Sequence, residues 1–208
     1  GPTYTTPSHF YLGEMGGYFS YDQMINIIDS MALLYPSLIT VKQQIDPTLS
    51  IEGNPIYYVK ISDNATVDES EPEILYTAVH HAREAESLSQ LIYYMWYLLE
   101  NYSTDVTIQS LVNNTEMFFV PCLNPDGYMY NQLIAPNGGG MWRKNRRDNL
   151  DGKFGVDLNR NYDYFWDLMI QAHRPLQVMK PIEAQLHFQN LKHRPSVIFQ
   201  LHTSLNMR

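Results

Sequence analysis

The pattern of apolar and polar positions predicts helices and strands in turn along the chain. Apolar residues recur at helical intervals from Met24 to Leu34 and from Leu88 to Leu99, which predicts helices over residues 20–35 and 84–102. Ser20 followed by Gln23 has the spacing of a capping box and marks the start of the first helix. Strand-like runs occur at residues 39–43, 55–61, 73–79 and 116–121. Strands that alternate with helices indicate an α/β domain with a mostly parallel or mixed sheet.

The segments between these elements are expected to be irregular. Residues 1–19 are rich in Gly, Pro and Tyr and are interpreted as an extended N-terminal arm. The string Asn124-Pro125-Asp126-Gly127 predicts a turn. A loop of about thirty residues, rich in Gly and Asn, then runs to Asp157, and loops of that length in a compact domain are usually functional or disordered.

The amino-acid composition excludes several classes of protein. The 208 residues are 44% hydrophobic and 17% charged, which excludes a disordered tail and a coiled coil. A net charge of −8, with basic residues clustered only at 143–147, argues against nucleic acid as a partner. The single cysteine, Cys122, excludes an internal disulfide. The longest apolar run, residues 91–99, is short of the roughly 20 residues that span a bilayer, and no secretory leader opens the chain.

The most informative stretch places a histidine and a glutamate at the junction of a strand and a helix. The strand that starts at Glu73 is predicted to end in His81, and the next helix to begin at Glu84. This spacing lets an imidazole nitrogen and a carboxylate converge on one ion, and zinc suits that pair of ligands. An isolated His-x-x-Glu also fits a turn histidine followed by an exposed carboxylate at a helix start.

A second stretch carries arginines in loops. Residues 141–147 read Met-Trp-Arg-Lys-Asn-Arg-Arg, and residues 155–161 read Gly-Val-Asp-Leu-Asn-Arg-Asn. Arginines near a metal could bind an anionic group of a substrate and a polarised carbonyl. The alternative is a solvated basic loop on an acidic protein.

These motifs occur in an order that resembles a known enzyme family. His81-x-x-Glu84, Asn124-Pro-Asp-Gly-Tyr128, the string 141–147 and Asp157-Leu-Asn-Arg-Asn-Tyr162 follow one another as in the M14 zinc metallocarboxypeptidases of the carboxypeptidase A/B/T type, particularly the secreted bacterial members. The resemblance covers residues 16–166. It implies a three-layer α/β/α fold with a mixed central sheet, of which residues 20–167 form the N-terminal part. It also implies a secreted or periplasmic protein.

The resemblance also implies a role for each motif residue. His81 and Glu84 would be the first two ligands of a single zinc ion, and Arg143 would polarise the scissile carbonyl. The residues that would bind the substrate are Arg83, Asn159 and Arg160. An arginine fork with an asparagine donor is suited to a C-terminal carboxylate, and zinc lowers the pKa of its bound water toward about 7. The implied reaction is hydrolysis of the C-terminal bond of a peptide.

The match to the family is interrupted after residue 167. The family carries a third histidine ligand, a tyrosine and a catalytic glutamate further along, and only His202 superficially resembles the histidine. We interpret residues 168–208 as an out-of-frame tail. When this segment is reverse-translated and triplets are read from the third base of each codon, the permitted residues include strings that resemble the family. Met179 followed by Lys180 forces a glutamate in that frame. The true third histidine would then follow Arg208, and the nucleotide sequence is the test.

Three functions therefore stay open at this point. The first is a zinc carboxypeptidase lineage in which the 208-residue chain itself is expected to be inactive. The second is a non-catalytic domain that binds metal or peptide termini. The third is a related zinc deacylase that acts on N-acyl amino acids. The sequence specifies neither the side chain of the released residue nor the oligomeric state.

Overall fold

A mixed sheet organises the part of the chain that the computed structural model describes, residues 5–45 and 50–161. In space the strands follow the order β1-β2-β4-β3, and β3 is parallel to β4 while the other neighbours are antiparallel. The strands are β1 (Gln43–Gln44), β2 (Tyr57–Ile61), β3 (Glu73–Thr77) and β4 (Glu116–Val120). The predicted α/β fold with a mixed sheet is confirmed.

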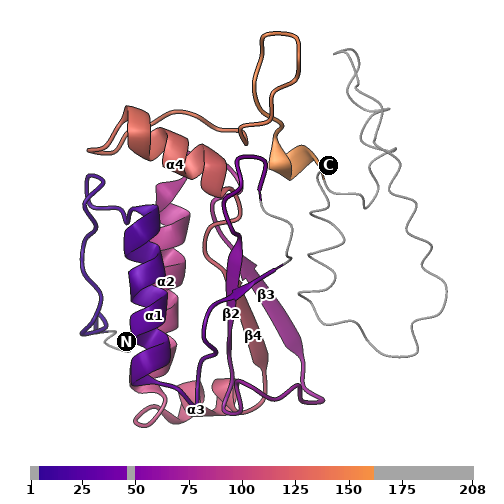
Figure 1. Cartoon of the computed structure of the whole chain (residues 1–208). Helices are drawn as coiled ribbons and strands as arrows, with labels where there is room; N and C mark the ends of the chain where they lie inside the picture. Colours follow the sequence, from indigo (N-terminus) through magenta and orange to yellow (C-terminus); the bar gives the residue numbers. More distant parts are fainter. Residues whose placement is uncertain (1–4, 46–49, 162–208) are drawn as a thin grey trace, which may run out of the picture.

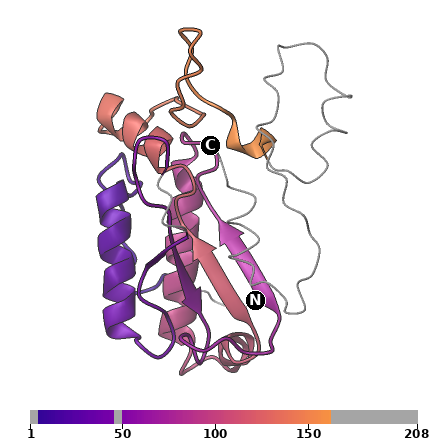
Figure 2. The same cartoon turned by 45° about the vertical axis from the view of Figure 1, so that its right-hand side comes forward.

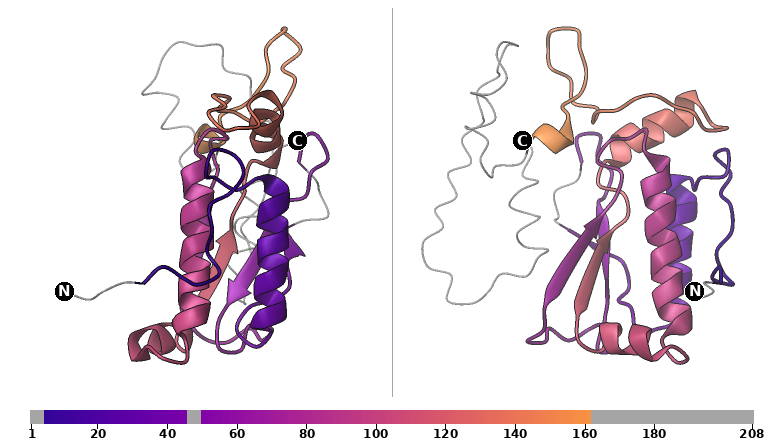
Figure 3. Two further views of the ribbon diagram at one scale, coloured as in Figure 1. Left: turned by 90° about the vertical axis from the view of Figure 1, so that its left-hand side faces the viewer. Right: turned by 180° about the vertical axis from the view of Figure 1, so that it is seen from behind.

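Two long helices cover one face of this sheet. Figures 1 and 3 show α1 (Tyr21–Leu34) and α2 (Ala85–Asn101) side by side on that face. Their apolar residues pack against β2 and β4, and Ile28, Met95 and Phe119 are fully buried among them. Within the described residues the opposite face carries no helix (Figure 2).

The first helix begins where the sequence predicts. The Ser20 hydroxyl accepts a hydrogen bond from the Gln23 amide, and the Gln23 side chain accepts one from the Ser20 amide. Gln23 also accepts a hydrogen bond from the Glu14 amide at 3.1 Å, so the same side chain fastens the N-terminal arm. That arm is less extended than predicted, because two antiparallel bridges close a turn across residues 13–18.

All four predicted strands are shorter in the structure, and two of them differ most from the prediction. The predicted strand at 39–43 is reduced to β1 and an isolated bridge between Ile39 and Ile61. The predicted strand from Glu73 to His81 is wrong at its end, because β3 stops at Thr77. Val79 has a φ of 56°, in the left-handed region, which is incompatible with a continuing strand.

Two helices were missed by the sequence prediction. One is α3 (Val106–Val112), capped by Asp105, whose carboxylate accepts from two backbone amides. The other is α4 (Pro125–Ile134), which begins inside the predicted Asn-Pro-Asp-Gly turn. Asn124 is its N-cap and Pro125 occupies its first position, where a missing N–H costs nothing.

The proposed out-of-frame tail lies outside the described residues, as do its boundary at residue 168 and His202. Among the described helices, none has both the length and the apolar character needed to cross a membrane.

Candidate active site

The turn between β3 and α2 brings His81 and Glu84 together. Ser87 closes the turn: its hydroxyl accepts a hydrogen bond from the Val79 amide at 3.0 Å and donates one to the Glu84 carbonyl at 2.6 Å. The Glu84 amide donates to the His81 carbonyl at 3.0 Å. As a result His81 Nδ1 lies 2.8 Å from Glu84 Oε1. The left-handed Val79 is strained backbone of the kind that collects at functional sites.

The other nitrogen of His81 contacts a residue that the sequence analysis did not single out. His81 Nε2 lies 3.1 Å from Asp157 Oδ1, so the imidazole sits between two carboxylates. Its side chain is 9% exposed, whereas that of Glu84 is 50% exposed. Glu84 therefore faces the open side of the site and Asp157 lies behind the ring. The sequence signal for Asp157 was its place at the head of the Asp-Leu-Asn-Arg string.

Asp157 also binds the arginine that was predicted to polarise a carbonyl. Arg143 donates from Nε and Nη2 to Asp157 Oδ2, at 3.2 and 3.0 Å. Partial burial tends to raise the pKa of Asp157, but the Arg143 hydrogen bonds and charge, with the His81 contact, hold that pKa below its usual value. In these contacts Nη1 of Arg143 is unused by any described residue, and this part of the guanidinium is available to a ligand.

Hydrogen bonds from the turn itself and from α4 hold the arginine loop in place. The Ala82 amide donates to the Arg143 carbonyl at 2.9 Å, which joins the turn to the loop directly. The Asn131 side chain in α4 accepts from the Trp142 amide at 2.9 Å and donates to the Trp142 carbonyl at 2.8 Å. The backbone on either side of Arg143 is thereby fixed.

The long loop is ordered by a buried asparagine. The Asn145 side chain, in a residue only 5% exposed, accepts from the amides of Val156 and Arg147 at 2.7 and 3.3 Å. Gly155 has a φ of 92°, and a Cβ there would lie 2.7 Å from the Asn145 carbonyl oxygen. Gly155 and Asn145 therefore allow the two sides of the loop to pack closely backbone against backbone. The loop is ordered at these residues, so the alternative of a disordered loop is wrong for them.

The side chain of Arg146, in the same loop, packs against aromatic rings. Its guanidinium lies 3.8 Å from the centre of the Tyr130 ring and 4.6 Å from that of Trp142, and its Nε lies 3.5 Å from Glu52 Oε1. Cation–π contacts of this kind favour arginine. At this position the predicted alternative of a fully solvated basic cluster is wrong.

The Asn-Pro-Asp-Gly string anchors α4 beneath the turn. Asn124 donates to the His80 carbonyl at 3.2 Å and accepts from the Gly127 amide at 3.1 Å. Gly127 is packed so closely that a Cβ would lie 2.4 Å from the Lys144 carbonyl oxygen and 2.7 Å from the Ala82 Cβ. This glycine therefore lets α4, the turn and the arginine loop meet.

The three predicted substrate residues are all exposed. Asn159 and Arg160 lie in a short 3-10 helix, η1 (Leu158–Arg160), which Asp157 caps through the Asn159 amide at 3.0 Å. Arg160 Nη1 donates to the Asn159 carbonyl, and the other donors of its guanidinium have no partner among the described residues. Arg83 is exposed in the turn, and its side chain makes no hydrogen bond or ion pair with another described residue.

Comparison with known proteins identifies the family of this chain. The family model for zinc carboxypeptidases (M14) matches residues 24–183. The chain belongs to the zinc carboxypeptidase family. This confirms the resemblance to that family.

Two curated relatives and a solved structure agree with the family. A zinc carboxypeptidase of Saccharothrix mutabilis subsp. capreolus is 33% identical over 150 residues, covering 72% of this chain and 33% of the relative. Metallocarboxypeptidase A of Trichophyton tonsurans is 30% identical over 183 residues, covering 84% of this chain and 42% of the relative. The crystal structure of carboxypeptidase A from Helicoverpa armigera superimposes with a TM-score of 0.61 at 30% identity, over 73% of this chain and 35% of that one. The chain thus spans about a third to two fifths of the length of these carboxypeptidases.

Gly127→Ala tests the packing beneath the site. Because the new methyl group meets a backbone carbonyl, we expect the free energy of unfolding to fall by about 1–3 kcal/mol. Leu133→Ala, at a 78% exposed position on the same helix, is the control and should change it by less than about 0.5 kcal/mol. Urea unfolding measures both variants in the full-length protein, by which we mean the chain continued in the family's reading frame past residue 167. Equal midpoints for the two variants would contradict the packing argument.

Proposed function

We propose that this chain carries the first part of a zinc carboxypeptidase active site, which hydrolyses the C-terminal peptide bond of peptides. The observation that supports it most is the chain of contacts from Glu84 through His81 and Asp157 to Arg143. Four charged or ionisable groups from two distant segments meet there. The family membership supports the reaction class, and the contacts support the roles proposed for these residues.

The donor atoms fit a zinc ion. His81 Nδ1 and Glu84 Oε1 are directed at the same space, and an imidazole with a carboxylate is a ligand pair found in catalytic zinc sites. Asp157 behind the ring fits the second requirement, since a zinc-bound histidine usually donates its other N–H to a carboxylate. His81 and Glu84 would therefore hold the ion, with Asp157 fixing the tautomer and orientation of the ring. Bound zinc would supply a water of lowered pKa as nucleophile.

The remaining residues would bind and orient the peptide. Arg143 is held by Asp157 through Nε and Nη2, so its Nη1 can donate to the carbonyl oxygen of the scissile bond. Asn159 and Arg160 lie two and three residues after Asp157 and are exposed, which suits capture of the substrate's terminal carboxylate. We place Arg83, exposed in the turn beside the two ligands, at the adjoining part of the substrate site.

An acylated amino acid also ends in a carboxylate, so the deacylase alternative shares this recognition. The two functions differ in what lies on the other side of the scissile bond. Comparing turnover of a blocked dipeptide with that of an N-acetyl amino acid by the full-length protein tests the proposal. Preference for the N-acetyl amino acid would reject the peptidase assignment.

Removal of either proposed ligand should release zinc. We expect His81→Ala and Glu84→Ala in the full-length protein to lower zinc affinity by more than about 100-fold, because loss of even an outer partner of a ligand costs about 10–100-fold. Glu86→Ala removes an exposed carboxylate two residues away and should keep the metal. Metal content by mass spectrometry after dialysis is the measurement. Zinc retained at about one per chain in Glu84→Ala would disprove its role as a ligand.

Asp157→Asn tests the carboxylate that contacts Nε2 of His81. The amide oxygen can still accept from His81, but the charge that favours the Nε2–H tautomer is lost, so zinc affinity should fall by about 10–100-fold. Asp151→Asn, at an exposed carboxylate in the same loop, is the matched control. Competition with a chromogenic chelator gives the affinities. Equal values for both variants would mean that Asp157 does not support the metal.

Arg160→Lys tests recognition of the terminal carboxylate. Lysine keeps the charge but loses the planar fork, so peptides with a free C-terminus should bind about tenfold more weakly or worse, while their C-terminal amides are unaffected. Arg147→Lys changes a nearby arginine outside η1 and should alter neither. Inhibition constants of paired acid and amide peptides provide the comparison. Equal losses for acid and amide would show that Arg160 does not bind the carboxylate.

A further inference from the structure

A hairpin projects from the loop that carries Arg143. Residues 147–155 form it, and an antiparallel bridge joins the backbones of Asp148 and Phe154. Figure 1 shows this hairpin in orange, rising beyond α4 and away from the sheet. We call it the finger. Its two ends continue into the segments that hold Arg143 and Asp157, so the finger stands at the edge of the proposed active site.

The tip of the finger is held by side chains that bind the backbone. Asp148 Oδ1 accepts from the Leu150 amide at 2.8 Å, and Asp151 Oδ1 accepts from the Lys153 amide at 2.9 Å. The Asn149 amide donates to the Lys153 carbonyl at 3.1 Å, which closes the hairpin beneath the tip. The position of Leu150 at the tip is therefore fixed by the fold.

Leu150 is unfavourable for the fold in two ways. Its φ is 60°, in the left-handed region, where a residue with a Cβ is strained and glycine is not. The residue is also 91% exposed, so its apolar surface stays in water. Strained residues of this kind persist where the surrounding structure fixes them, and they collect at active and binding sites. The apolar surface of Leu150 is thus presented to a ligand.

The place of the finger indicates which ligand reaches it. Asn145 fixes the base of the finger beside Arg143, and Leu150 is five residues further along the chain than Asn145. Five residues of extended chain span about 17 Å at most. A substrate whose scissile carbonyl lies at Arg143 covers the same distance with about five residues on its N-terminal side. Leu150 is therefore at a suitable distance from substrate residues about four to six positions before the scissile bond.

The surroundings of Leu150 disfavour other surfaces that an exposed leucine could contact. Asp148 and Asp151 flank it, and Lys153 is the one cation among residues 148–154, so an anionic lipid surface would be repelled. A stable dimer buries about 800 Å² on each partner, which is far more than Leu150 and the partly exposed Phe154 provide. A peptide side chain is small enough to be covered by this tip.

We propose that the finger is a second contact for long peptide substrates, in which Leu150 binds an apolar side chain about four to six residues before the scissile bond. This rests on the proposed carboxypeptidase function and adds a preference for part of the substrate. Burial of the leucine against an apolar partner favours binding. Because the contact is the same in the bound substrate and in the transition state, it should lower KM and leave kcat unchanged.

The test compares peptides that share the same two C-terminal residues and differ in length. The full-length protein is given a blocked dipeptide and peptides of about eight residues in which one leucine is moved along a serine background. We expect kcat/KM to rise at least about fivefold, through KM, when the leucine stands about four to six residues before the scissile bond. No hydrolysis of any peptide would reject the proposed function, whereas hydrolysis with the same kcat/KM at every leucine position would reject the finger contact alone.

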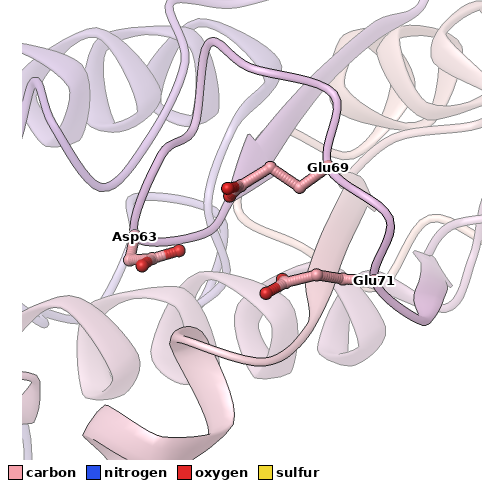
Figure 4. Close-up of side chains that lie close together, drawn as sticks. All are labelled: Asp63, Glu69 and Glu71. Carbon is pink, nitrogen blue, oxygen red and sulfur yellow. The ribbon is translucent and has the colours of Figure 1, made fainter.

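Leu150→Gly removes the side chain and suits the left-handed backbone. We expect the preference for leucine to disappear, while the blocked dipeptide, which is too short to reach the tip, is hydrolysed as before. Val67→Gly is the matched control, because Val67 is 52% exposed and lies in the segment that joins β2 to β3, at the opposite end of β3 from the active-site turn. Figure 4 shows three side chains of that segment, Asp63, Glu69 and Glu71. A preference retained in Leu150→Gly, or an equal loss in both variants, would overturn the proposal.

Thermal unfolding separates binding from a structural role of Leu150. Because glycine relieves the strain and the leucine is exposed, Leu150→Gly should leave the unfolding midpoint unchanged or raise it. A midpoint lowered by about 5 °C or more would mean that another part of the full-length protein covers Leu150. A change of oligomeric state on gel filtration would mean that a second copy covers it. Either result would overturn the proposal.

Discussion

The carboxylate of Asp157 is the group on which the geometry of the active site depends. One oxygen contacts the imidazole of His81 and the other accepts both hydrogen bonds from Arg143, while a backbone amide of η1 is held by the first. A single side chain therefore relates a proposed zinc ligand, the group proposed to polarise the carbonyl and the helix that carries the proposed carboxylate-binding residues. Because its contacts are charge-assisted and partly buried, small displacements of this carboxylate would disturb all three.

The sheet explains why distant parts of the sequence can meet there. The parallel pairing of β3 with β4 brings the turn after β3 next to the residues after β4, and Ala78 bonds to both Val120 and Leu123 across that junction. Asn124 and Gly127 then seat α4 beneath the turn, and Asn131 in α4 holds the loop that carries Arg143.

The sequence predicted those elements whose signals are local. The first helix followed from its apolar periodicity and capping box, and His81 with Glu84 followed from their spacing. The start of α4 could not be predicted in this way, because Pro125 and Gly127 resemble a turn until their tertiary contacts with Ala82 and Lys144 are known. The end of β3 was misplaced because the left-handed Val79 is stabilised by Ser87, eight residues further on. Asp157 was overlooked since its partners lie far from it in sequence, although the family motif contained it.

The most direct test of the central claim is a crystal structure of the zinc-loaded, full-length protein, with anomalous diffraction measured above and below the zinc edge. The account predicts one strong zinc peak about 2.0–2.2 Å from both His81 Nδ1 and a carboxylate oxygen of Glu84, with Asp157 accepting a hydrogen bond from His81 Nε2. A zinc ion bound to Nε2, or the absence of a zinc peak at His81 and Glu84, would contradict it.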